Sequence, residues 1–248
     1  MDQILSQYFD LSLMWDHFDE VLAGFWITIK LSLLSGGLAL IWGLVLAQLR
    51  QLPGRALAPV RGLAIAYIDV FRGIPLLMIV VLISGSLPFL TFLPESVRIP
   101  HWFGEPDPFW YGVMALTITY GAYMAEVYRA GIEAVPKGQM EAARSLGMSH
   151  RQAMRNVILP QAVRKVFAPL LNDFIALMKD TTLVSVIALN EVLLVGRDIY
   201  TDTYNSSALT LGAIMFLVVT LPLARFVDKL ISREQSRFTR GAPRVEAL

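Results

Sequence analysis

Long uncharged apolar blocks constrain this chain more than any other feature of its sequence. Residues 31–49 carry no formal charge, and neither do residues 73–94. A helix needs about 20 mostly apolar residues to cross the hydrocarbon core of a bilayer. Charged residues make up 17% of the chain, whereas soluble domains contain about 25%. The sequence therefore predicts an all-α integral membrane protein.

Five segments of the chain are candidates for transmembrane helices. The fourth is the least apolar, because it contains Asp173, Lys179 and Asp180. The predicted spans cover residues 21–49, 63–93, 109–128, 166–189 and 204–224.

The charges of the connecting segments predict the orientation of these spans. Lysine and arginine gather in the connection after the first span, between the third and fourth spans, and after the fifth span. Acidic residues dominate the N-terminal segment and the two remaining connections. Because short cytoplasmic loops are rich in Lys and Arg, the N-terminus is expected outside and the C-terminus inside. The predicted organisation is an extracytoplasmic segment 1–20, a transmembrane domain 21–230 and a cytoplasmic tail 231–248.

The basic segment between the third and fourth spans has a clear local pattern. Residues 139–146 are rich in helix formers, and Gly147 stands where a left-handed C-cap residue is favoured. Ser149 and Gln152 have the spacing of a capping box and predict the start of a second short helix. Pro160 is expected in the first turn of the fourth span. A short helix in a cytoplasmic loop is either a plain surface helix or a docking element for a partner.

This segment resembles the loop signature of ABC importer permeases. In that signature Glu-Ala-Ala is followed by three residues, Gly, nine residues, Ile, one residue and Leu-Pro. Val157 takes the place of the isoleucine here, and the remaining fixed positions match. They are Glu141, Ala142, Ala143, Gly147, Leu159 and Pro160.

Three further motifs resemble the branch of that family that transports polar amino acids, such as histidine, glutamine, glutamate, arginine and opines. They occupy residues 71–76, 122–126 and 179–185, in the second, third and fourth predicted spans. The resemblance implies the transmembrane domain of a type I ABC importer, and it extends over roughly residues 20–230.

The resemblance also implies partners and a mechanism of alternating access. A coupling loop, residues 131–160, would insert its short helix into a cytoplasmic ATPase, with Glu141, Ala142, Ala143 and Gly147 carrying the coupling. The complex would contain a second permease subunit, either identical or similar, two copies of the ATPase and an extracytoplasmic amino-acid-binding protein. ATP and Mg would bind the ATPase, so this chain would need no cofactor and would not be an enzyme. Its location would be the inner membrane of a bacterium, in contact with lipid.

Ionisable residues at membrane depth predict a substrate site on the fourth span. Asp173 and Asp180 are seven residues apart, so they lie on nearly the same helix face and could bind an ammonium group. Each of them could instead pair with Arg or Lys of another span or, in the case of Asp180, brace the outer gate. Asn172 and Thr182 are neighbouring polar candidates.

Polar residues of the third span complete the predicted substrate site. Thr119 and Tyr123 are candidates, although tyrosines on an apolar helix are more often packing residues.

Two further pairs of charged residues have the i, i+3 spacing of structural ion pairs. These pairs are Asp69 with Arg72 and Glu126 with Arg129.

Other functional classes find little support in the sequence. The chain has no cysteine, no phosphate-binding Gly-x-x-x-x-Gly-Lys-Ser/Thr loop and no cluster of histidines with metal-ligand spacing. These features argue against a membrane enzyme or a metal site, and the basic tail is interpreted as a lipid-facing anchor rather than a nucleic-acid site. The remaining alternative is a gradient-driven secondary amino acid transporter that works as a homodimer.

Overall fold

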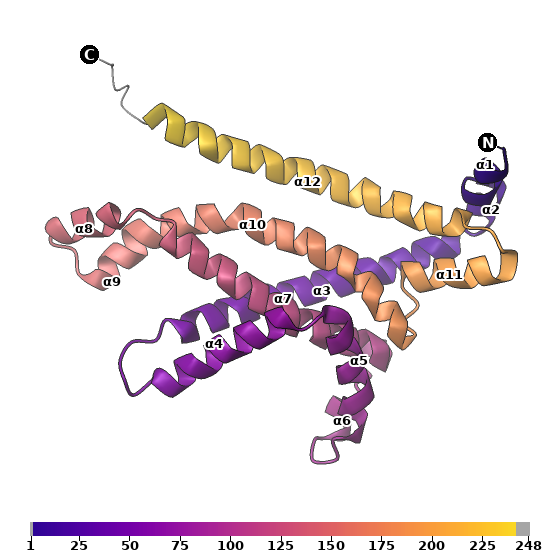
Figure 1. The fold of residues 1–248 in the computed structure, drawn as a ribbon, viewed down its shortest axis with the longest axis horizontal. Helices are drawn as coiled ribbons and strands as arrows, with labels where there is room; N and C mark the ends of the chain where they lie inside the picture. Colours follow the sequence, from indigo (N-terminus) through magenta and orange to yellow (C-terminus); the bar gives the residue numbers. More distant parts are fainter. Residues whose placement is uncertain (1, 242–248) are drawn as a thin grey trace.

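The computed structural model describes residues 2–241, and every regular element within them is helical (Figure 1). The longer helices are α3 (Phe18–Arg50), α4 (Ala58–Gly73), α5 (Leu76–Ser86), α7 (Asp107–Glu133), α10 (Leu159–Asp180) and α12 (Ser207–Gly241). The shorter helices are α1 (Asp2–Tyr8), α2 (Leu11–Asp16), α6 (Glu95–Arg98), α8 (Lys137–Ser145), α9 (His150–Ala153) and α11 (Val192–Thr203). Four short segments are 3₁₀ or π helices: η1 (Leu87–Phe89), η2 (Trp102–Gly104), η3 (Met154–Ile158) and η4 (Thr181–Ile187). The predicted all-α fold is confirmed.

Within the described residues, two helices are long and apolar enough to cross a membrane by themselves. They are α3 and the Ser207–Ser232 part of α12, and the bent pair α4 and α5 makes a third if it counts as one span. α3 coincides with the first predicted span. The count of five spans therefore stays a prediction.

The second predicted span, residues 63–93, is not one continuous helix. The axes of Ala58–Gly73 and Leu76–Phe89 differ by 106°. The break lies at Ile74 and Pro75: Ile74 has an extended backbone with φ −91° and ψ 131°, and Pro75 is the N-cap of α5. Proline disfavours helical geometry in the residue before it, so the Ile-Pro dipeptide ends α4 and starts a new direction.

The other predicted spans differ from the structure mainly at their ends. α7 extends a few residues beyond both ends of the third predicted span, and α10 changes into the 3₁₀ helix η4 after Asp180. Pro160 lies in the first turn of α10, as predicted. α12 continues through the fifth predicted span into the predicted tail as far as Gly241. The rest of that tail, residues 242–248, lies outside the described residues.

Small residues allow α3 and α7 to pack closely, and this is the main helix contact of the fold. A Cβ added at Gly43 of α3 would lie 2.9 Å from the carbonyl oxygen of Gly121 on α7. A Cβ at Gly36 would lie 2.7 Å from the ring of Phe174 on α10. The close approach of these helices therefore depends on the missing side chains of Gly36 and Gly43.

The helices place two of the acidic segments at the opposite end of the molecule from the basic connections. Figure 1 shows α8 and α9 at one end, together with the connection between α3 and α4. It shows α1, α2 and α11 at the opposite end.

The N-terminal segment is hydrogen-bonded to the turn between α11 and α12. Gln7 donates a 2.8 Å hydrogen bond to the carbonyl of Tyr204, and Asn205 donates a 2.9 Å bond to the carbonyl of Ser6.

Candidate translocation and coupling sites

Tyr120 and Asp180 connect α7 with α10 through a side-chain hydrogen bond. The hydroxyl of Tyr120 donates to Oδ2 of Asp180 over 2.8 Å, and only 5% of Tyr120 is exposed. The rings of Tyr120 and Tyr123 lie with their centroids 5.8 Å apart. Asp180 therefore has a partner on another helix, as one of the sequence interpretations proposed, but that partner is a neutral phenol rather than Arg or Lys.

Asp173 lies on the same helix as Asp180. Its Oδ2 is buried and has no hydrogen-bond partner among the described residues. Arg72 of α4 and Tyr120 of α7 are both close enough to interact with it electrostatically. A buried carboxylate oxygen without a partner is costly unless a ligand or another group completes it. Asp173 is thus a predicted site residue with a buried oxygen that lacks a hydrogen-bond partner, and Arg72 is the charged group that interacts with it.

The predicted ion pair between Asp69 and Arg72 is wrong. Within the described chain Asp69 forms no ion pair, and Arg72 instead places its guanidinium 5.7 Å from the ring centroid of Tyr123. The hydroxyl of Tyr123 reaches the carbonyl oxygen of Arg72 at 3.5 Å. The last turn of α4 thus places this arginine beside α7, so Arg72 and Tyr120 join the candidate site, although neither was predicted as a substrate residue from the sequence.

The remaining predicted substrate residues have different surroundings. Thr119 is buried, and its hydroxyl has no partner among the described residues. The hydroxyl of Thr182 donates a 2.8 Å bond to the carbonyl of Lys179 in the preceding turn. Asn172 is exposed and forms no hydrogen bond within the described part of the chain. The structure therefore groups Asp173, Asp180 and Tyr123 around Tyr120, while no side-chain hydrogen bond among the described residues joins the other three to that group.

The predicted C-cap at Gly147 is confirmed. Gly147 has φ +84° directly after α8, and the amide of Met148 donates to the carbonyl of Ala143 over 3.2 Å. The amide of Gly147 also donates to the carbonyl of Arg144 over 3.0 Å. These two bonds form a Schellman motif, which requires a left-handed residue at the position of Gly147.

The predicted capping box at Ser149 and Gln152 is also confirmed. The amide of Gln152 donates to the Ser149 hydroxyl oxygen over 3.2 Å, and the amide of Ser149 donates to Oε1 of Gln152 over 2.8 Å. Between α9 and α10 the chain forms the π helix η3. Pro160 cannot donate an amide proton to the preceding turn, and a local change of helical pitch is one way to accommodate this loss.

The faces of α8 separate the predicted coupling residues into two groups. Glu141 and Ala142 are exposed, whereas Ala143 is 3% exposed and lies within the chain. No atom lies within 4 Å of a Cβ added at Gly147, and Leu146 beside it is 80% exposed. The tip of α8 therefore presents an open glycine and an uncovered leucine, while Ala143 packs the helix onto its own chain.

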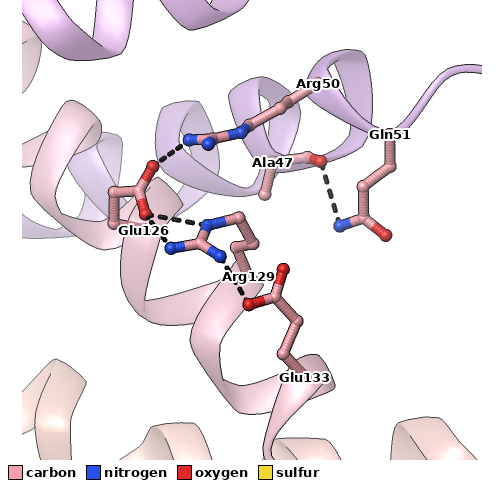
Figure 2. Close-up of polar contacts among 6 residues, drawn as sticks. All are labelled: Ala47, Arg50, Gln51, Glu126, Arg129 and Glu133. Atoms are coloured by element: carbon pink, nitrogen blue, oxygen red, sulfur yellow. Dashed lines mark hydrogen bonds and ion pairs between the residues drawn. The ribbon is translucent and has the colours of Figure 1, made fainter.

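Glu126 connects the ends of α3 and α7, and Figure 2 shows its contacts. It forms ion pairs with Arg50 of α3 and with Arg129, which lies 2.7 Å away on its own helix. Arg129 also pairs with Glu133 at 2.5 Å. The predicted pair of Glu126 and Arg129 is confirmed, and the contact with Arg50 extends it into a network of four charges.

Comparison with known proteins identifies the family that this sequence matches. Residues 39–235 match the family described as "Binding-protein-dependent transport system inner membrane component". The probable glutamine ABC transporter permease GlnM of Bacillus subtilis is 34% identical, over 92% of this chain and 100% of the relative. The glutamate transport permease GluC of Corynebacterium glutamicum is 35% identical, over 90% and 98% of the two chains.

A solved structure extends the comparison to three dimensions. A chain in a crystal structure of an amino acid ABC transporter with histidines is 34% identical, with a TM-score of 0.78 over 89% of this chain and 96% of that chain. The resemblance to ABC importer permeases is therefore confirmed. Such a subunit is a transport component, and nucleotide binds to the ATPase rather than to it. The chain belongs to the family of binding-protein-dependent transport system inner membrane components, as a multi-pass permease subunit of an ABC importer for polar amino acids in the bacterial inner membrane.

Proposed function

We propose that this permease crosses the membrane five times, with its N-terminus outside and its C-terminus inside. The spans are α3, the bent pair α4 and α5, α7, α10 with η4, and the apolar part of α12. Residues 1–20 form the extracytoplasmic segment, and residues 231–248 form the cytoplasmic tail. The support is the excess of Lys and Arg in the connections assigned to the inside.

The absence of cysteine makes this topology directly testable. In spheroplasts, a membrane-impermeant maleimide should label a Ser12→Cys variant, because Ser12 lies in the N-terminal segment. A Ser145→Cys variant at the end of α8 should react only after the membrane is permeabilised. Labelling of both variants in sealed spheroplasts, or of neither, would contradict the proposed orientation.

The transport site takes the ammonium group of a polar or charged amino acid. The observation that carries this proposal is the buried, unpartnered oxygen of Asp173, which lies near Tyr120 and Arg72, while Tyr120 also bonds to Asp180. Carboxylates at membrane depth usually face a cavity or a partner of opposite charge. The site also includes Thr119 and Tyr123 of α7, Asn172 of α10 and Thr182 of η4. The names of the relatives, which mention glutamine and glutamate, favour a substrate of this class.

Uptake by reconstituted proteoliposomes tests the substrate site. The permease, its ATPase and its binding protein should accumulate a labelled polar amino acid only when ATP is enclosed with the ATPase. Asp173→Asn keeps the shape of the side chain but removes its charge, so apparent affinity should fall about tenfold or more. Unchanged affinity and specificity would remove Asp173 from the site. Uptake that follows an ion gradient without ATP would favour the secondary transporter instead.

Coupling to the ATPase takes place at the tip of α8. Glu141, Ala142 and Gly147 offer the contact surface, and Ala143 holds the helix in position from its buried side. The functional unit is a dimer of permease subunits, identical or similar, with two copies of the ATPase and an extracytoplasmic binding protein. ATP binding and hydrolysis in the partners then close and open the two sides of the transport path alternately.

A further inference from the structure

A basic surface pocket follows α8 at the end of the molecule that is proposed to face the cytoplasm. Its volume is about 580 Å³, and it is lined by Ser149, Arg151, Gln152, Arg155 and Asn156. The lining contains two arginines and no acidic residue. Such a pocket has the composition of a receptor for carboxylate or phosphate groups.

Its two arginines lack partners within the described residues. The side chains of Arg151 and Arg155 form neither a hydrogen bond nor an ion pair there, and both residues are exposed. Three other arginines at this end are engaged within the chain. Arg50 pairs with Glu126, Arg129 pairs with Glu126 and Glu133, and Arg144 donates to the carbonyl of Met148 over 2.8 Å.

Arg151 lies in α9 and Arg155 in the π helix η3 that continues it, and the local fold holds both arginines on one side of this helical segment. They are four residues apart, so their side chains leave the same face. The capping box fixes the start of the helix, and Ala153 and Ile158, which are 0% and 5% exposed, attach its other face to the chain. Like charges at this spacing repel each other in the isolated subunit. A bound anion would relieve that repulsion.

We propose that this pocket is a second docking contact for the ATPase and receives a segment of it that carries Asp or Glu. The proposal rests on the proposed coupling role of α8. The pocket begins two residues after Gly147 and so continues the exposed surface that includes Leu146. An arginine guanidinium binds a carboxylate through two parallel hydrogen bonds. The pocket would therefore fix the orientation of the ATPase on α8 and strengthen its binding at low salt.

Charge reversal at the pocket tests this contact. The full-length permease is placed in nanodiscs of zwitterionic lipid, and binding of the ATPase that co-purifies with it is measured at low and high salt. Arg151→Glu with Arg155→Glu should weaken binding about tenfold or more at low salt and flatten its salt dependence. Arg55→Glu is the matched control, since Arg55 is exposed and without a partner in the connection before α4. The variants must keep the thermal midpoint of the unmodified permease.

Zero-length crosslinking identifies the group in the pocket. In an Arg155→Lys variant, a carbodiimide should join the new lysine to a carboxylate of the ATPase through an amide bond. Mass spectrometry should find this product with Arg155→Lys and not with Arg55→Lys. Unchanged affinity and salt dependence of the double variant, together with absence of the crosslink, would overturn the proposal. So would a loss of binding that appears only in anionic lipid, because the pocket would then hold lipid headgroups.

The same experiment separates failure of this inference from failure of the proposed function. If the unmodified permease binds the ATPase and the double variant binds it equally well, only the pocket proposal fails. If the unmodified permease binds no ATPase, the coupling role of α8 fails, and the pocket proposal fails with it.

Discussion

Tyr120 of α7 donates a 2.8 Å hydrogen bond to Asp180 at the end of α10. This bond joins two helices next to Asp173, whose Oδ2 has no partner among the described residues. Asp180 is also the last residue of α10 before the chain continues as the 3₁₀ helix η4. The bond therefore fixes the position of one carboxylate of the proposed substrate site, and it leaves the other carboxylate available for a ligand.

Removing this bond should change substrate affinity more than stability. In Tyr120→Phe the ring stays but the donor to Asp180 is lost, so the carboxylate is free to move away from the site. The apparent KM for uptake should rise about three- to tenfold, equivalent to about 1 kcal/mol for one hydrogen bond. Tyr128→Phe serves as the control, because its hydroxyl bonds to the carbonyl of Leu40 instead. Equal KM values for both variants and the unmodified protein would contradict the role given to Tyr120.

The charge network around Glu126 should contribute to the stability of the α3 and α7 contact. Its side chain is 15% exposed, and Glu126→Gln leaves Arg50 and Arg129 without their shared negative charge. We expect a loss of about 1–3 kcal/mol, measured as a lower thermal midpoint in detergent. Glu133→Gln removes a carboxylate from the same arginine, but this side chain is 61% exposed, so the change should be below about 1 kcal/mol. Equal losses in the two variants would show that burial of the network is unimportant.

Two glycines of α3 should respond differently to the addition of one methyl group. A Cβ at Gly43 would lie 2.9 Å from the backbone oxygen of Gly121, which cannot move alone, so Gly43→Ala should destabilise the protein by about 1–3 kcal/mol. Nothing lies within 4 Å of a Cβ at Gly37. Gly37→Ala should be neutral or slightly stabilising, because alanine favours helix. Thermal midpoints that fall equally would mean that α3 and α7 separate more easily than the structure indicates.

Short-range features of this fold could be predicted from sequence because a few neighbouring residues determine them. The left-handed turn at Gly147 and the capping box at Ser149 depend on hydrogen bonds within one or two turns, and both were predicted. The ends of the spans were less predictable. Helices such as α7 continue beyond their apolar parts, where hydropathy gives no signal.

Contacts between residues far apart in the sequence could be predicted less well. Spacing suggested a pair of Asp69 with Arg72, but the packing of α4 against α7 places Arg72 next to Tyr123. The sequence predicted the pair of Glu126 and Arg129, but not the addition of Arg50, which lies 76 residues before Glu126. The fold also decides which face of α8 is open, so the burial of Ala143 could not be read from its motif. Motifs thus indicated the segments proposed to be functional, while the packing of the helices decides which of their residues are buried and which are exposed.

ATP-driven transport by this permease depends on binding of the ATPase at the tip of α8, which is the central claim of the proposed function. Gly147 has φ +84° and open space around it, and a side chain there would both strain the turn and obstruct close approach by a partner. Gly54 is a matched control, with φ +89°, open space and a position in the other connection assigned to the cytoplasm.

Co-purification of the ATPase with tagged permease, followed by an ATPase assay on the complex, is the most direct test of that claim. The unmodified permease and Gly54→Asp should both retain the ATPase and show activity stimulated by the loaded binding protein. Gly147→Asp should insert into the membrane in similar amounts but lose both the ATPase and the stimulation. Normal retention of the ATPase and normal uptake by Gly147→Asp would contradict the assignment of α8 as the coupling helix.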